Sequence, residues 1–238
     1  MEKIFAYCER GTDPAFWAEP LNAISNAAFL IAAIAALMEW NRGRHDLRGN
    51  DLGGGVELSL IALVAVIGIG SFLFHTFATR WAAVADVLPI TLFMFAYLGY
   101  ALPRFLGLSW IATIVGLAAF FAAISMAEST TCGGSPCLNG SVGYVPALAA
   151  LGVIGAWLAY IAHPASRPIL TGTALFAVSL AFRTLDRSIC PATALFGGRE
   201  FGTHFIWHVC NAALLYLLLR AAVRHGLAPM SGRAPRMV

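Results

Sequence analysis

The segment Gly202–Val223, GTHFIWHVCNAALLYLLLRAAV, is the stretch of the sequence that decides the fold. A helix needs about 20 mostly apolar residues to cross a bilayer, and this segment is long enough. Two histidines, His204 and His208, interrupt the apolar run four residues apart. Residues at this spacing lie on the same face of a helix. The segment therefore predicts a transmembrane helix that carries two imidazoles on one face.

The composition of the whole chain is typical of a membrane protein. Of the 238 residues, 59% are hydrophobic and only 11% are charged, whereas about a quarter of the residues of a soluble domain are charged. The net charge of +3 is small and the basic residues do not cluster, which argues against nucleic-acid binding. No linker or repeat divides the chain. We expect one membrane domain over residues 1–238, surrounded by lipid and without an obligate protein partner.

The hydropathy pattern predicts an all-α bundle of seven transmembrane helices. Turn-forming residues separate the apolar segments, and Pro103-Arg104 is expected to separate the third from the fourth. The predicted spans are 21–40, 56–76, 82–102, 105–126, 142–162, 168–186 and 202–223.

Seven spans place the two termini on opposite sides of the membrane. With the N-terminus outside, nine of the 15 Lys and Arg residues lie on the inner side. Because basic residues concentrate on the cytoplasmic side, this count favours an outer N-terminus and an inner C-terminus.

Four of the five cysteines fall on the predicted outer side, where disulfides can persist. Cys132 and Cys137 share one short loop and could form a local bridge. Cys8 and Cys190 would then tie the N-terminal segment to the last outer loop. Four free thiols are the alternative.

The six histidines separate by membrane side. Three of them, His45, His163 and His225, lie at the predicted inner side, where solvated side chains are the simplest interpretation. His75, at the end of the second span, meets His204 and His208 at the outer side. Three neutral imidazoles with an open position are typical of a catalytic zinc site. The alternative is hydrogen bonding between helices, which also uses histidine.

Two further polar residues accompany His75. Ser71 lies four residues before it, and Asp86 lies about one turn into the third predicted span. An ionisable group inside a span is a functional-site hypothesis by default. Asp86 could accept a proton from a zinc-activated water or hold an imidazole, and Ser71 could bond the water or a developing oxyanion. The alternatives are a Ser71 that bonds to its own helix and an Asp86 stabilised by the helix dipole.

Five stretches together resemble the alkaline ceramidase family, within the superfamily of progestin and adiponectin receptors and haemolysin III-like proteins. The motif S-x3-H, the following D-x-x-P and the H-x3-H of the last span carry the resemblance. The stretches are YCERG (7–11), AEPLNAISN (18–26), GIGSFLFH through ADVLP (68–89), LDRSIC (185–190) and HFIWH (204–208).

The resemblance implies a seven-helix zinc amidase that splits ceramide into a sphingoid base and a fatty acid. His75, His204 and His208 match the zinc ligands. Ser71 and Asp86 match the residues around the reacting water, with Asp86 passing protons to the leaving amine. The positions of Cys8 and Cys190 match a family disulfide. Asn211, three residues after His208, would support the ligands.

Some family members also bind calcium near the N-terminus, and the resemblance implies a possible second cofactor here. Glu9 and Glu19 match that pattern, and the Tyr7 carbonyl could contribute. Ala6 and Gly11 stand where the family pattern has oxygen-bearing side chains, so Asp13 would have to substitute. Calcium takes six to eight oxygen ligands. The alternative is a solvated acidic segment.

Two other functions remain open. The chain could be a receptor-like or structural protein in which zinc braces the bundle. It could also be a serine hydrolase that uses Ser71, although GIGSF is not a nucleophile-elbow pattern. We expect a multi-pass protein of a bacterial plasma membrane whose active site faces the outer, periplasmic side.

Overall fold

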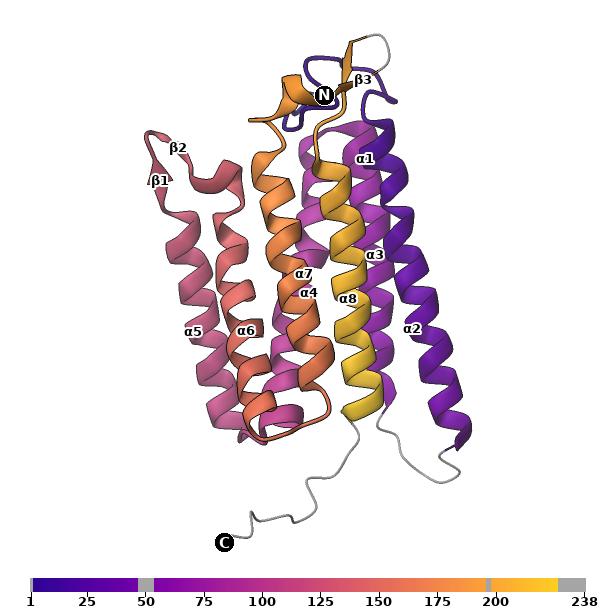
Figure 1. Ribbon diagram of the computed structural model, residues 1–238, viewed down its shortest axis with the longest axis vertical. Helices are drawn as coiled ribbons and strands as arrows, with labels where there is room; N and C mark the ends of the chain where they lie inside the picture. Colours follow the sequence, from indigo (N-terminus) through magenta and orange to yellow (C-terminus); the bar gives the residue numbers. More distant parts are fainter. Residues whose placement is uncertain (1, 47–53, 196–197, 227–238) are drawn as a thin grey trace, which may run out of the picture.

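In the part of the chain that the structure describes, seven membrane-length helices stand side by side in a bundle (Figure 1). The computed structural model describes residues 2–46, 54–195 and 198–226, and within them it confirms the predicted all-α class. The seven apolar helices indicate an integral membrane protein. The first span consists of α1 (Pro20–Ser25) and α2 (Ala27–Asp46), and the others are α3 (Gly55–Phe77), α4 (Arg80–Leu106), α5 (Trp110–Glu128), α6 (Val145–Tyr160), α7 (Ser166–Leu185) and α8 (His204–His225).

The predicted break at Pro103-Arg104 is wrong. Helix α4 passes through Pro103 and ends at Leu106, because a proline in the last turn removes a single backbone hydrogen bond. Gly107 ends the helix instead, with a left-handed backbone (φ 66°) and an N–H that bonds to the Leu102 carbonyl. Helix α5 consequently begins at Trp110 rather than at residue 105, behind the N-cap Ser109.

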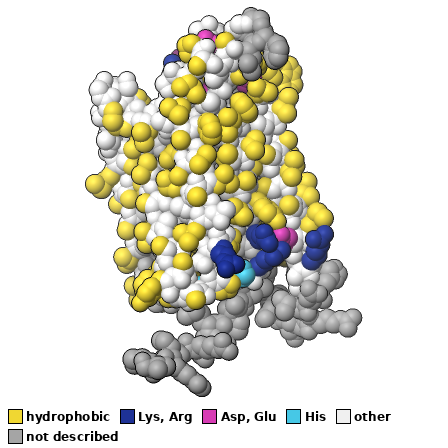
Figure 2. All heavy atoms as spheres, in the orientation of Figure 1, with side chains coloured by type: hydrophobic (Ala, Val, Ile, Leu, Met, Phe, Trp, Pro, Cys, Tyr) yellow, Lys and Arg dark blue, Asp and Glu magenta, His cyan; other side chains and the backbone are white. Residues whose placement is uncertain are grey.

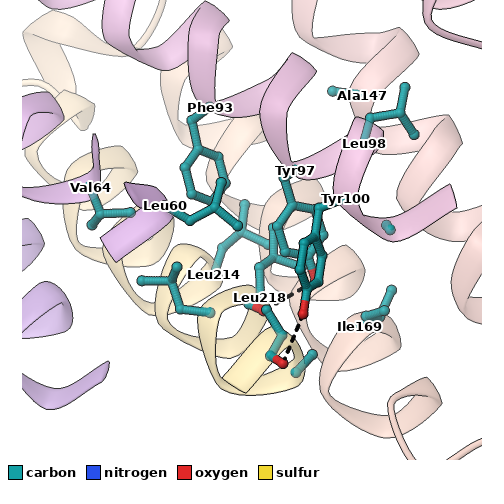
Figure 3. Close-up of a cluster of buried hydrophobic side chains, with 14 of the residues drawn as sticks. Leu60, Val64, Phe93, Tyr97, Leu98, Tyr100, Ala147, Ile169, Leu214 and Leu218 are labelled. Carbon is teal, nitrogen blue, oxygen red and sulfur yellow. Dashed lines mark hydrogen bonds between the residues drawn. The ribbon is translucent and has the colours of Figure 1, made fainter. Parts of the chain in front are cut away.

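Helix α8 lies between α2 and α7 and also contacts α3, whereas α3 packs mainly against α4. Inside the bundle, two tyrosines of α4 bond to backbone carbonyls of α8 (Figure 3). The Tyr97 hydroxyl donates to the Leu218 carbonyl at 3.1 Å and the Tyr100 hydroxyl to the Ala222 carbonyl at 3.2 Å. Hydrophobic side chains cover most of the face in Figure 2, with charged side chains gathered at its two ends.

Short elements lie at the end of the bundle that carries the N-terminus (Figure 1). The N-terminal segment is held there by the bond from the Ile4 N–H to the Ala78 carbonyl (2.7 Å). The remaining elements are two hairpins and three 3₁₀ turns: β1 (Thr131–Cys132) with β2 (Ser135–Pro136), β3 (Ala194–Leu195) with β4 (Arg199–Glu200), η2 (Cys137–Gly140), η3 (Val142–Tyr144) and η4 (Cys190–Thr193).

The outer location of this end stays a prediction. Of the nine basic residues expected on the inner side, Arg48, Arg233 and Arg236 lie outside the described residues.

Candidate metal centre

Three histidines from two helices converge at the end of the bundle that the N-terminal segment covers. His75 lies in the last turn of α3, and His204 and His208 lie in the first turns of α8. All three are buried, and each offers a ring nitrogen that lies within 4.8 Å of those of the other two. Their ring centroids are 4.6 to 5.1 Å apart. The spacing suits three nitrogen ligands around one metal ion.

Hydrogen bonds fix the orientation of two of these rings. His75 bonds through Nδ1 to a carboxylate oxygen of Glu19 at 2.6 Å, which leaves its Nε2 buried and without a protein partner. His208 bonds through Nδ1 to the Ser25 hydroxyl at 2.8 Å. A metal-ligating histidine commonly uses its second nitrogen in this way. The donor set therefore fits a metal, and zinc in particular.

The third ring is held by the N-terminal segment and by the start of α8. The Tyr7 ring stacks on His204 with a centroid distance of 3.7 Å and an interplanar angle of 19°. One carboxylate oxygen of the buried Asp186 accepts the N–H groups of Thr203 (2.7 Å) and His204 (2.9 Å), and the other accepts that of Cys8 (3.0 Å). Asp186 thus caps α8 where its first histidine stands.

Ser71 and Asp86 are brought together because α3 and α4 approach each other closely. A Cβ at Gly70 would collide with the backbone carbonyl of Ala85, so glycine is needed at this crossing. The Ser71 hydroxyl interacts with the Asp86 carboxylate, and both residues line the cavity that His204 and His208 also line. One oxygen of Asp86 is buried without a hydrogen-bond partner in the protein. The pair is therefore available to a bound molecule.

The residues expected to bind calcium are engaged otherwise. Arg10 Nε donates to one oxygen of Glu19, while His75 and Asn22 bond to the other. The Arg10 guanidinium is fully buried and also donates to four backbone carbonyls, those of Asp13, Ala15, His75 and Thr76. These are oxygen ligands of the kind that calcium takes. The donor set does not fit calcium, because a guanidinium already occupies its centre.

The other three expected calcium ligands, Glu9, Asp13 and the Tyr7 carbonyl, accept hydrogen bonds from backbone N–H groups, in the last case that of Gly11 (3.3 Å). Both oxygens of Glu9 accept N–H groups at the start of α1, those of Leu21 and Asn22 (2.8 Å each). Asp13 is exposed and accepts the Ala15 N–H. Among the described residues, the three carboxylates do not form a group with ligand spacing. Calcium binding stays a prediction that this arrangement does not favour.

Two pKa values are shifted in the N-terminal segment. Burial would raise the pKa of Glu19, but the hydrogen bonds from His75 and Arg10 outweigh it and hold that pKa below its usual value. Burial raises the pKa of the Tyr7 phenol to about 12, although the Arg183 guanidinium opposes the shift. Tyr7 is therefore neutral, and Glu19 is ionised, at physiological pH.

Two disulfides form, between Cys8 and Cys190 and between Cys132 and Cys137. The first joins residues 182 positions apart and holds the N-terminal segment, including Tyr7, over the histidines. Cys210 is the one free cysteine in the part of the chain that the structure describes.

An apolar cavity of about 270 Å³ extends from the histidines into the bundle. Asn211 and His208 line this cavity, and Tyr7, Ser71 and Asp86 line it as well. The sequence pattern had not singled out Arg183, Tyr144 and Trp207, which also line this cavity. It had likewise missed Arg10, Asp186 and Ser25. Signals for most of them were present in the sequence: Arg183 and Asp186 are charged residues within a predicted span, and Arg10, Ser25 and Asp186 lie in stretches that carry the family resemblance.

The comparison with known families agrees with this arrangement. A family model described as "Ceramidase" matches residues 6–228 of the chain, from the N-terminal segment through the last helix. No curated protein matches the chain significantly.

Proposed function

The chain belongs to the ceramidase family, and from this premise we propose that its three-histidine centre holds zinc and hydrolyses the amide bond of ceramide or a related N-acyl sphingolipid. Family membership supports ceramide hydrolysis in general. The observation that carries the finer proposal is the convergence of three buried imidazoles, two of which line one apolar cavity together with Ser71 and Asp86.

His75, His204 and His208 would hold the ion. When bound, zinc supplies Lewis-acid chemistry that activates water and polarises the amide carbonyl. Glu19 and Ser25 orient two of the imidazoles through Nδ1, so that the ligand nitrogens face one point. Neither residue needs to touch the substrate.

Asp86 moves the proton in this proposal. Its unpartnered oxygen accepts a proton from the attacking water and delivers it to the nitrogen of the leaving amine. The Ser71 hydroxyl interacts with the same carboxylate and keeps it directed at the cavity. The products are a carboxylic acid and an amine, which become a carboxylate and an ammonium ion once the remaining proton of the water moves to the amine, so atoms and charges balance.

The apolar part of the cavity would take hydrocarbon. Phe93, Met94, Leu98, Ile154 and Leu214 line it away from the histidines. A lipid amide could then place its carbonyl at the polar end while its chains stay out of water. We further propose that this end faces the periplasmic side of a bacterial plasma membrane, as the charge count predicts.

The decisive experiment combines metal analysis with turnover on the purified, full-length protein. We expect about one zinc per chain in the wild type, and release of sphingoid base from ceramide. His208→Ala should lose both the zinc and the turnover. Asp86→Asn should keep the zinc and lose the turnover by a factor of at least about 100. His225→Ala, at the opposite end of α8, is the matched control and should retain both.

Other results point to other functions. Zinc without hydrolysis of any amide, ester or lactam would favour a structural or receptor-like protein. Labelling of Ser71 by a fluorophosphonate would favour a serine hydrolase. Full ceramide turnover in His208→Ala would refute the zinc proposal.

A further inference from the structure

Arg183, near the end of α7, places a half-buried positive charge at the wall of the cavity. Its Nη1 donates to the Tyr7 hydroxyl at 3.0 Å, while its Nε is buried without a hydrogen-bond partner. Among the described residues, no carboxylate oxygen lies within 4.0 Å of the guanidinium nitrogens. A guanidinium nitrogen that is shielded from water without a partner is costly, so Nε is available to an acceptor that enters the cavity.

The surroundings of Arg183 hold the guanidinium mainly by aromatic rings, and the charge of Asp86, which lines the same cavity, acts on it without an ion pair. Its central carbon lies 5.3 Å from the ring centroids of Tyr144 and Trp207 and 5.8 Å from that of Tyr7. Aromatic faces attract a cation but carry no net charge. The three rings therefore fix the position of the guanidinium and leave its charge to act on whatever enters the cavity.

Arg183 lies close enough to the histidines to contact the polar group of a lipid bound there. The Tyr7 ring contacts both Arg183 and His204, so a single aromatic ring separates the guanidinium from the candidate metal centre. Arg183, Asp86 and His204 all line the same cavity. A polar group of a lipid at the histidines is thus within one ring's width of the guanidinium.

We propose that Arg183 binds a carboxylate of the lipid that occupies the cavity. A planar carboxylate matches the guanidinium fork, and the bond is charge-assisted. This inference rests on the proposed function, because cleavage of an N-acyl amide by water yields, after proton transfer, a fatty-acid carboxylate and an ammonium ion within the cavity. The second source of the same chemistry is a carboxylate on the head group of the uncleaved lipid.

The test compares palmitate with hexadecanol, which has the same chain and no charge. Equilibrium binding to the purified, detergent-solubilised protein requires no turnover. The wild type should prefer palmitate by about tenfold or more, the usual contribution of a charged hydrogen bond. Arg183→Gln should abolish this preference and leave hexadecanol binding unchanged, while Arg183→Lys keeps part of it.

The matched control is Arg104→Gln. Arg104 also lies over a tyrosine ring, but it stands in the last turn of α4, away from Asp86 and the cavity. The control variant should retain the full preference for palmitate. Two results together would overturn the proposal. Arg183→Gln would bind palmitate as tightly as the wild type, and it would hydrolyse the acidic lipid N-palmitoylserine as fast as the wild type. Ordinary hexadecanol binding by that variant shows that it is folded.

Hydrolysis separates the two sources of the carboxylate. If the head group is the ligand, Arg183→Gln should slow cleavage of N-palmitoylserine about tenfold relative to neutral N-palmitoylsphingosine. If the product is the ligand, the ratio of the two rates stays that of the wild type and inhibition by palmitate weakens. Absence of hydrolysis of either lipid would refute the proposed function, while the binding experiment would still decide the role of Arg183.

Discussion

Replacing Arg10 by methionine should destabilise the protein strongly, because it leaves the Glu19 carboxylate buried without its cation. The side chains of Arg10 and Glu19 are 0% and 3% exposed, respectively. Breaking a buried pair from one side costs about 3–5 kcal/mol, since the remaining charge is uncompensated. For a chain of this size, each kcal/mol lowers the melting temperature by about 2–4 °C. We therefore expect a decrease of about 10 °C in Arg10→Met, which keeps most of the side-chain volume.

The double variant Arg10→Met/Glu19→Gln is the control that isolates the charge. A glutamine at position 19 can still accept a hydrogen bond from His75 Nδ1, but it has no charge to leave unpaired. The double variant should therefore be more stable than Arg10→Met alone, by about 2 kcal/mol or more. Thermal unfolding in detergent, followed by circular dichroism, measures both variants under the same conditions.

The same experiment tests whether an arginine stands where calcium was expected. The melting temperature of the wild type should not change when millimolar calcium is added. Unchanged stability in Arg10→Met would refute the assigned role of the guanidinium. Stabilisation of the wild type by calcium would show that the ion binds despite Arg10.

Three further predictions follow from the packing around the centre. Gly70→Ala should lower the free energy of unfolding by about 1–3 kcal/mol and lower ceramide turnover, because the added Cβ pushes α4 and Asp86 away. The control is Gly99→Ala, whose Cβ would meet only Leu117 at 3.6 Å; it should change neither the stability nor the turnover. Loss of the Cys8–Cys190 bridge by double serine substitution should destabilise the protein by about 3 kcal/mol more than loss of Cys132–Cys137, because the two bridges join residues 182 and 5 positions apart; equal melting temperatures of the two variants would contradict this. Tyr7 should titrate near pH 12 in an absorbance titration, and comparison with Tyr7→Phe, which lacks this phenol, identifies its signal. Because the pKa of Tyr7 is raised in the folded state, its contribution to stability is complete below about pH 10 and is lost as the pH rises through 12. A Tyr7 pKa near 10 would show that the ring is not buried.

The sequence alone determined the seven-helix class and nominated the histidines. Hydropathy over about 20 residues is a local property, and the spacing of His204 and His208 follows from helix periodicity. His75 could be added because seven spans set which segments end on the same side. The helix boundary at Pro103 could not be located in this way, since a proline in a last turn and a proline in a loop have the same local sequence.

Only the tertiary structure decided which partners these residues have. Glu19 matched a calcium pattern, but folding brings it to His75, 56 residues further along the chain. The sequence pattern singled out neither Arg10 nor Arg183. In the fold, one fills a cradle of carbonyl oxygens and the other lies among three aromatic rings at the cavity wall. The physical reason is that a pattern reports which face of one helix is polar, whereas the energy of a buried charge depends on the groups that other elements pack against it.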